Sequence, residues 1–379
     1  MLFAERQFIY MKVGILTFHR ADNYGAVLQT YALYSQCKEM GYDTEVIDYR
    51  CSAIENVYWP IRFPKLRRNM YRWAISAASY LCYEQEWREK AKRFNSFREL
   101  FSMSSPHYDT TSKREIEEKY DFIITGSDQI WNRGILSEPN YWYCYKKETE
   151  SDTKVISYAA SVGSLTRFKQ GFGDYETVLR DYDAISVRES DVQAYLEEVM
   201  DRKVYTVLDP TLIVDKQLWL NLIRHDDNKR EKYLVYYDVA QNKVSRKIAG
   251  DIARKNKCAI VKFNQIKSPT MNTKYFSDAG PIEFLNCIYN AECIVTSSFH
   301  ATVFSILFGK KFVAALHPIT GERIRSLLTM LGLESRIVYE HDKNIMEVMN
   351  QPIDYARVEE KLAALREFSI NFLTNALNF

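Results

Sequence analysis

Short apolar runs alternate with amphipathic stretches along most of the chain. Residues 12–18 and 121–125 have the length and apolar content of buried strands, whereas residues 25–40 carry apolar side chains at helical spacing. Strands and helices in alternation predict a parallel sheet with helices on both faces. A second series of the same kind begins with the apolar run 233–239. The pattern therefore predicts an α/β protein with two Rossmann-like, doubly wound domains that face a cleft.

The pattern also suggests how the chain divides. We expect a first domain at residues 11–215 and a second at residues 216–379, which ends in a long C-terminal helix. The first ten residues, 1–10, contain Glu5 and Arg6 and lack the apolar core of a secretory signal. We interpret them as a leader or an upstream start.

A basic and aromatic insert interrupts the first domain at about residues 56–100. Residues 56–83 contain no acidic residue, and their basic and tryptophan side chains are Trp59, Arg62, Lys65, Arg67, Arg68, Arg72 and Trp73. Such a segment is suited to an anionic membrane surface. The alternative is a solvated helical cover over the first domain.

Composition narrows the class of protein. The hydrophobic fraction of 46% and the charged fraction of 26% are typical of a soluble globular protein, and a net charge of +2 gives no strong field for nucleic acid. The seven cysteines include no CxxC pair, so we expect a reducing compartment and no structural zinc. No apolar stretch is long enough to span a membrane. We expect a cytoplasmic protein, or one at the inner face of the membrane.

Candidate chemistry gathers where the predicted strands end. Ligands of open α/β sheets bind at the carboxyl ends of the strands, and four polar segments follow such strands: residues 19–25, 126–132, 188–189 and 297–300. Each has an ordinary structural explanation, such as a helix cap, a surface ion pair or a buried histidine with satisfied nitrogens. Four segments on one edge favour a binding site. The sequence contains no GxGxxG, GxxxxGK[ST] or HExxH motif.

These segments resemble the polysaccharide pyruvyl transferase family. The resemblance covers about residues 11–333 and rests on the strings NYGAVLQ, GSDQIWN, SVRE, DP and SSFHA, which begin at Asn23, Gly126, Ser186, Asp209 and Ser297. It implies a glycosyltransferase-B-like fold and transfer of pyruvate from phosphoenolpyruvate to a saccharide, with formation of a pyruvate ketal on a surface polysaccharide. The resemblance also implies that the reaction needs no metal. It implies no cofactor, since phosphoenolpyruvate is a co-substrate.

The resemblance further implies roles for individual residues. The family's catalytic histidine falls on His300, and a donor-binding arginine falls on Arg188. Many members carry a second arginine where this chain has Ser298, which we retain among the donor-binding residues. Either another cation replaces that arginine, with Lys311, Arg323 and Arg325 as candidates, or the donor is held differently. The residues expected to bind the acceptor or line the cleft are Asn23, Tyr24, Gly25, Gly126, Ser127, Asp128 and Trp131.

The chemistry of the donor fits these residue types. Phosphoenolpyruvate carries a phosphate and a carboxylate, which favour arginine forks and helix N-termini. The methylene carbon must be protonated, and histidine is the usual acid near neutral pH. A helix N-terminus disfavours an imidazolium, so we expect that a carboxylate beside His300 or the bound phosphate offsets this effect, with Glu322 or Asp128 as candidates for the carboxylate.

Two other functions stay open at this point. One is a nucleotide-sugar glycosyltransferase of the same two-domain build, and the other is a non-catalytic relative that binds saccharide or a partner. The absence of an arginine at Ser298 is the feature that favours the non-catalytic alternative. The acceptor sugar, whether it is lipid-linked, and the ketal stereochemistry are not encoded in these motifs.

Overall fold

The structure is a computed structural model of residues 1–379. The parts of the chain that it describes are residues 11–50, 70–109, 112–132, 134–135, 143–147, 151–223, 231–239, 243–263, 273–316, 321–339, 342 and 344–378.

A parallel six-stranded sheet forms the first half of the molecule, in the order β2-β1-β3-β4-β5-β6. All seven residues of β3 and the last four of β1 are buried, because helices cover both faces of the sheet. The strands are β1 Lys12–Leu16, β2 Asp43–Val46, β3 Phe122–Asp128, β4 Lys154–Ala160, β5 Ala184–Val187 and β6 Tyr205–Thr206.

A second parallel sheet of six strands has the order β12-β11-β10-β7-β8-β9. Its central strand β10 is buried throughout, and β7 and β11 pair with it in parallel register. The strands are β7 Tyr233–Tyr237, β8 Ala259–Lys262, β9 Thr273–Tyr275, β10 Cys293–Thr296, β11 Lys311–Ala315 and β12 Ile337–Val338.

Helices connect most of the parallel strands. Those of the first half are α1 Tyr24–Glu39, α3 Met70–Arg98, α4 Lys113–Lys119, α5 Leu165–Gln170, α6 Gly173–Arg180, α7 Ser190–Met200, α8 Pro210–Ile213 and α9 Lys216–Leu220. Those of the second half are α10 Lys243–Asn256, α11 Pro281–Asn290, α12 Phe299–Leu307, α13 Glu322–Leu331, the 3-10 turn η1 Glu334–Arg336, α14 Ile345–Asn350 and α15 Tyr355–Ala376.

The strand order of each sheet identifies the edge where a ligand should bind. The order reverses between β1 and β3 in the first sheet and between β7 and β10 in the second. Crevices of open α/β sheets form outside the carboxyl ends of the strands at such reversals. The expected architecture of two doubly wound parallel sheets is confirmed, and the ends of β3 and β10 are the places to search.

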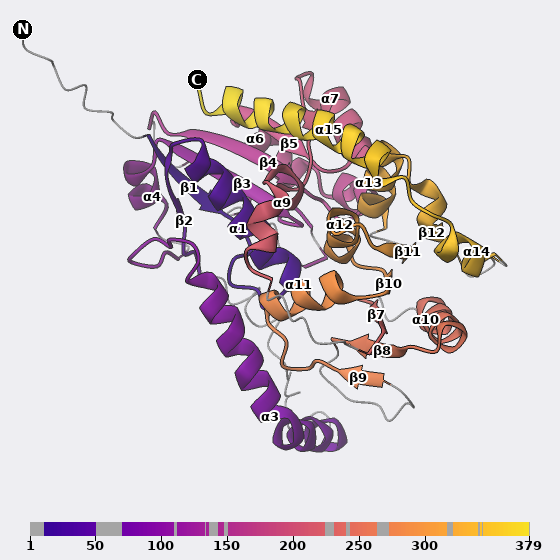
Figure 1. The fold of residues 1–379 in the computed structure, drawn as a ribbon. Coiled ribbons are helices and arrows are strands. Elements are labelled where there is room, and N and C mark those ends of the chain that lie inside the picture. Colours follow the sequence, from indigo (N-terminus) through magenta and orange to yellow (C-terminus); the bar gives the residue numbers. More distant parts are fainter. Residues whose placement is uncertain are drawn as a thin grey trace, which may run out of the picture.

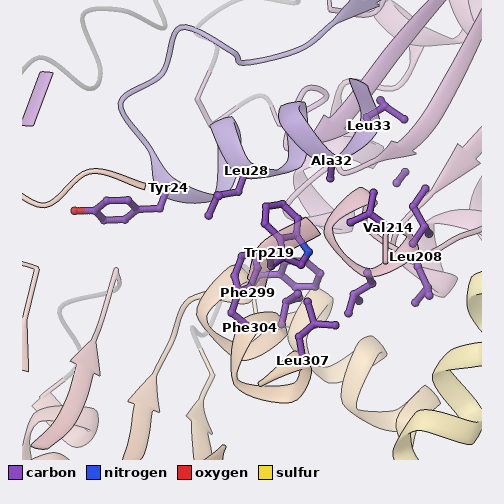
Figure 2. Packing of buried hydrophobic residues seen from close by; sticks show 14 of the residues in the cluster. Tyr24, Leu28, Ala32, Leu33, Leu208, Val214, Trp219, Phe299, Phe304 and Leu307 are labelled. Carbon is purple, nitrogen blue, oxygen red and sulfur yellow. The ribbon is translucent and has the colours of Figure 1, made fainter. Parts of the chain in front are cut away.

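Helix α1 lies between the two halves and is buried along most of its length. Its apolar side chains face those of α9 and α12, so that Leu28 and Ala32 come close to Trp219 and Phe304 (Figure 2). The ring centroids of Trp219 and Phe304 are 5.1 Å apart, edge to face. One continuous apolar core therefore joins the halves, and the positions of residues at both sheet ends are fixed relative to each other.

Helix α15 returns from the second half to the first (Figure 1). Oγ of Ser369 accepts a hydrogen bond of 3.0 Å from the backbone N–H of Leu208, and the ring of Phe372 lies 5.0 Å from that of Tyr205. The tyrosine hydroxyl of Tyr42 donates to the carbonyl oxygen of Leu377. The last helix, which we assigned to the second domain, therefore contacts the first sheet. The division of the chain between residues 215 and 216 stays a prediction.

The basic insert falls largely outside the described residues. Residues 51–69 are not described, and of residues 70–81 only the helical backbone of α3 is, so contact with an anionic membrane stays a prediction. The other end of α3 is anchored, because Arg98 donates to the carbonyl oxygens of His19 and Ala21. In the described ranges, no helix is long and apolar enough to cross a membrane.

The core between the halves leads to a test of stability. Replacing the fully buried Trp219 by alanine should lower the free energy of unfolding by about 3–5 kcal/mol, because it removes an indole from a packed core. Thermal melts of wild type and Trp219→Ala would measure this as a lower melting temperature. The control is Phe368→Ala, since that ring is 47% exposed on α15 and its loss should change little. Equal melting temperatures for all three proteins would contradict the shared core.

Candidate active site

His300 lies at the start of α12, directly after β10. Ser298 caps this helix, and its Oγ accepts a hydrogen bond of 3.4 Å from the backbone N–H of Ala301. The cap ends the strand and turns the chain, which places the imidazole at the carboxyl edge of the second sheet. The side chain of His300 is buried, and residue exposure is 6%. Ser298 therefore acts as the cap of helix α12. Its hydroxyl is uncharged and does not supply the cation that many family members carry at this position.

The motif around Gly25 in the first half fixes the imidazole of His300. Oδ1 of Asn23 accepts hydrogen bonds from the N–H groups of Gly25 and Ala26 and so begins α1. A methyl group added at Gly25 would lie 1.9 Å from Nδ1 of His300, far inside van der Waals contact. Only glycine leaves room for the ring here. The two halves therefore meet at this pair of residues.

Asp209 connects the groups around His300. Its side chain is fully buried, and Oδ2 lies 2.8 Å from Nη2 of Arg188, 3.4 Å from Oγ of Ser127 and 3.5 Å from Nε2 of His300. Oδ1 accepts hydrogen bonds from the backbone N–H and the hydroxyl of Thr211. The contact to His300 is long for a hydrogen bond, so the Nε2 proton is not committed to Asp209.

The charge of Asp209 shapes the electrostatics of the site. Burial alone would raise the pKa of this carboxyl group, but Arg188 and His300 outweigh burial and hold the pKa well below its ordinary value. A carboxylate thus stands beside His300 and opposes the effect of the helix N-terminus on an imidazolium. We expected Glu322 or Asp128 in this place. Glu322 instead pairs with Arg325, and Asp128 lies near Arg323.

Two guanidinium groups flank the ring of Phe299, next to His300. The guanidinium carbons of Arg188 and Arg323 lie 5.1 and 5.6 Å from the ring centroid. Arg188 follows β5 and also bonds to Oγ of Ser127 through Nε and Nη2. Arg323 is on α13, and its Nη1 lies 3.7 Å from Oδ1 of Asp128. The fold therefore brings two cations from different halves to one place.

Several polar atoms of this cluster are buried without a hydrogen-bond partner. Over the described part of the chain, they are Nη1 of Arg188, Nε of Arg323, Nε2 of His300 and Oε2 of Glu189. Buried polar atoms are almost always paired, so a group of unpaired ones needs an explanation. Three of the four are nitrogens of cationic or proton-donating side chains. The arrangement can accept a small anion and offer it a proton.

The last three residues of β3 also line this cluster. Gly126 has φ of +123°, and a Cβ there would lie 2.3 Å from the carbonyl oxygen of Tyr158, so only glycine fits. The backbone N–H of Ser127 donates to Oε1 of Gln29, which fixes the turn against α1. Asp128 follows with φ of +69°. These residues position the hydroxyl of Ser127 and the carboxylate of Asp128 toward the two arginines.

Three of the expected residues are not brought to the cluster. Lys311 is exposed at the first position of β11, and because the strands are parallel, this end lies opposite the carboxyl edge. The ring of Tyr24 stacks on Phe284 at 4.5 Å and its hydroxyl donates to a backbone carbonyl, so it belongs to the core between the halves. Trp131 is fully buried in the core of the first half.

His19, a second histidine at the carboxyl edge, has protein partners on both ring nitrogens. Nε2 lies 3.0 Å from Oδ1 of Asp48, and Nδ1 lies 3.0 Å from the carbonyl oxygen of Thr17. Burial lowers its pKa, although both partners oppose the shift. This histidine is a satisfied core residue, in contrast to His300.

Among the described residues, no group of three or more His, Cys, Asp or Glu side chains is arranged to hold a metal ion.

Solved structures share the fold at low sequence identity. The UDP-GlcNAc 2-epimerase from Neisseria meningitidis, bound to UDP-GlcNAc, has 12% identity and a TM-score of 0.52, over 96% of this chain and 100% of that chain. The UDP-GlcNAc 2-epimerase from Methanocaldococcus jannaschii, in complex with UDP-GlcNAc and UDP, has 13% identity and a TM-score of 0.50, over 94% of this chain and 100% of that one. The glycosyltransferase SnogD from Streptomyces nogalater has 9% identity and a TM-score of 0.42, over 97% and 99%. The likeness to the two epimerases shows the two-domain fold alone.

Sequence comparison identifies the family. No curated protein matches the chain. The model of the polysaccharide pyruvyl transferase family matches residues 23–316, which is more than half of the chain and includes Gly25, Arg188, Asp209 and His300. These are the residues that the fold brings together at the carboxyl edges of the two sheets, and this chain belongs to the polysaccharide pyruvyl transferase family.

Proposed function

We propose that this protein transfers pyruvate from phosphoenolpyruvate to a saccharide and forms a pyruvate ketal on two of its hydroxyl groups. The observation that carries the proposal is the pair of guanidinium groups, Arg188 and Arg323, against the ring of Phe299, next to His300. In the described part of the chain, Nε2 of His300 is buried without a hydrogen-bond partner and lies 3.5 Å from the carboxylate of Asp209. A small molecule with two anionic groups and a carbon that needs a proton matches this set. A saccharide acceptor accords with the family.

The donor would be bound through its charges. The phosphate and the carboxylate of phosphoenolpyruvate each accept hydrogen bonds from guanidinium groups. Arg188 is already ion-paired with Asp209, which holds it in position but also reduces its net attraction for an anion. In the described part of the chain, the ion pair of Arg323 is the longer contact of 3.7 Å to Asp128. We therefore assign the larger part of donor attraction to Arg323.

The reaction would begin with a proton from His300. Nε2–H donates to the methylene carbon of phosphoenolpyruvate, and positive charge develops on the neighbouring carbon, which bears the phosphate oxygen. An acceptor hydroxyl adds to that carbon, and its proton returns to His300. Asp209, 3.5 Å from Nε2, stabilises the imidazolium before transfer and again after it.

Arg323 also bears on the non-catalytic alternative. That alternative was favoured by Ser298, which stands where many members carry an arginine. A guanidinium from α13 lies against the same phenylalanine ring as Arg188, so the count of two cations is retained from a different position. This supports a donor site with altered layout over a site that has lost its donor.

The first test compares possible donors. Phosphoenolpyruvate at about 100 times its Kd should stabilise the folded protein by about 2.7 kcal/mol, because it binds only the folded state. A thermal-shift measurement with phosphoenolpyruvate, UDP-GlcNAc and inorganic phosphate would detect this as a raised melting temperature. Stabilisation by UDP-GlcNAc with no effect of phosphoenolpyruvate would overturn the proposal in favour of a nucleotide-sugar enzyme.

A second test concerns Arg323. Replacing it by glutamine should weaken phosphoenolpyruvate binding by about 1.5–3 kcal/mol, the scale of a charge-assisted hydrogen bond. Calorimetric titration would measure the change in Kd. The matched control is Arg325→Gln on the same helix, because that side chain pairs with Glu322 at the surface and should leave binding unchanged. Equal loss in both variants would mean that α13 contributes only general charge.

A third test concerns the acid. His300→Gln should fold and bind phosphoenolpyruvate, but turnover should fall by about 10²–10⁴, the usual contribution of a positioned acid. Phosphate release from phosphoenolpyruvate, with p-nitrophenyl glycosides of glucose, galactose and mannose as acceptors, would measure turnover alongside a thermal melt. Near wild-type turnover in the folded variant would exclude His300 as the acid.

A companion variant of the same test displaces the imidazole without replacing it. Gly25→Ala puts a methyl group where Nδ1 of His300 now packs, so turnover should fall while the histidine is retained. Gly250→Ala is the control, because the space around Gly250 is open and the helix α10 should tolerate or prefer alanine. Equal activity of the two glycine variants would contradict a catalytic role that depends on the placement of this ring.

A further inference from the structure

Glu189 is an ionisable residue of the cluster to which the steps above give no role. It follows Arg188 and occupies the N-cap position of α7, yet its carboxyl group makes no cap hydrogen bond. Residue exposure is only 2%. Oε1 accepts a hydrogen bond of 2.5 Å from Oγ of Ser161, whereas Oε2 is buried with no partner in the described part of the chain. One oxygen is thus fixed and the other is left for a ligand.

The surroundings of Glu189 make it able to hold a proton. Burial raises its pKa to about 7, although the hydrogen bond from Ser161 and the charges of Arg323 and Arg188 act against the shift. A protonated carboxyl group would need an acceptor for its O–H. No described protein atom supplies one at Oε2, and an oxygen of a phosphate held by the two arginines would.

We propose that Glu189 is the second acid–base residue of the reaction, which protonates the departing phosphate and then accepts the proton of the second acceptor hydroxyl. The inference rests on the proposed pyruvyl transfer and goes beyond the role of His300. It stands on the buried Oε2, which has no hydrogen-bond partner in the described part of the chain, in a residue that directly follows Arg188.

The step balances in atoms and charge. After the first hydroxyl has added, the central carbon bears a phosphate ester. Oε2–H of Glu189 donates its proton to the bridging oxygen, the carbon–oxygen bond breaks, and its electron pair leaves with hydrogen phosphate. The second hydroxyl oxygen then adds to the central carbon and gives its proton to the carboxylate of Glu189. Both His300 and Glu189 return to their starting states, and the ketal carboxylate and phosphate are the products.

Binding of phosphoenolpyruvate alone tests where Glu189 faces. An anion beside Glu189 favours its protonated form, so wild type should bind phosphoenolpyruvate more tightly at pH 6 than at pH 8. Glu189→Gln resembles the protonated form at every pH. We expect it to bind more tightly than wild type at pH 8 and to match wild type near pH 6, measured by calorimetric titration. The control is Glu198→Gln, on the exposed face of the same helix, which should follow wild type at both pH values.

Turnover tests the proton transfer itself. With the p-nitrophenyl glycosides as acceptors, Glu189→Gln should release phosphate about 10²–10⁴ times more slowly than wild type, although it binds the donor. Glu189→Asp keeps a carboxylic acid and should recover part of the turnover and the pH dependence of binding, which a purely structural role does not predict. It also serves as the test variant if Glu189→Gln fails to fold.

The outcomes separate the two proposals. Wild type that binds no phosphoenolpyruvate at either pH overturns the proposed function, and the role of Glu189 with it. Wild type that binds the donor, with Glu189→Gln parallel to it at both pH values, overturns only the role of Glu189. Full turnover of folded Glu189→Gln with any acceptor that wild type uses does the same.

Discussion

The candidate site depends on one buried carboxylate. Asp209 has no access to water, so its charge must be balanced by groups within hydrogen-bond distance. Arg188, His300 and the capping contacts to Thr211 supply that balance from three separate segments of the chain. Removing one partner of a buried ion pair costs about 3–5 kcal/mol. Loss of activity on replacement of Arg188 would therefore mix donor binding with stability, whereas Arg323, with its longer ion pair, separates the two.

The position of His300 is a joint product of both halves of the molecule. Strand β10 and the Ser298 cap determine where helix α12 begins, and so they place the backbone of His300. The absence of a side chain at Gly25 leaves room for the ring of His300. This contact is reliable only if the halves keep a fixed relation. The apolar core along α1, in which Trp219 packs against Phe304, holds the two halves in a fixed relation (Figure 2). Packing in this apolar core, outside the polar cluster, thus controls the placement of the proton donor.

The sequence predicts the architecture well, for a physical reason. Parallel strands buried on both faces are continuous apolar runs, and these are visible without any knowledge of tertiary contacts. The hydrophobic pattern does not predict strands β9 and β12, because they contain only three and two residues. Lys311 shows the converse limit, because a cation next to an apolar run can lie at either end of a strand, and here it lies at the wrong one.

The site itself is only partly visible in the sequence. His300 and Arg188 stand in family strings, whereas Arg323 lies beyond the matched residues 23–316. Its place beside Phe299 follows from the packing of α13, which no local pattern encodes. Asp209 stands in a recognisable string, but its role as the partner of His300 depends on contacts between distant segments.

Charge balance suggests why the site combines so many ionisable groups. The cluster combines three carboxyl groups, of Asp128, Asp209 and Glu189, with the side chains of Arg188, Arg323 and His300, so without a ligand it has as many potential anions as cations. Phosphoenolpyruvate adds further negative charge to this buried place. Glu189, whose pKa burial already raises, can offset part of that charge by taking up a proton. On this argument, the charge of the donor itself favours the protonated form of the acid that helps phosphate to leave, and the arginines hold the donor while the proton is used.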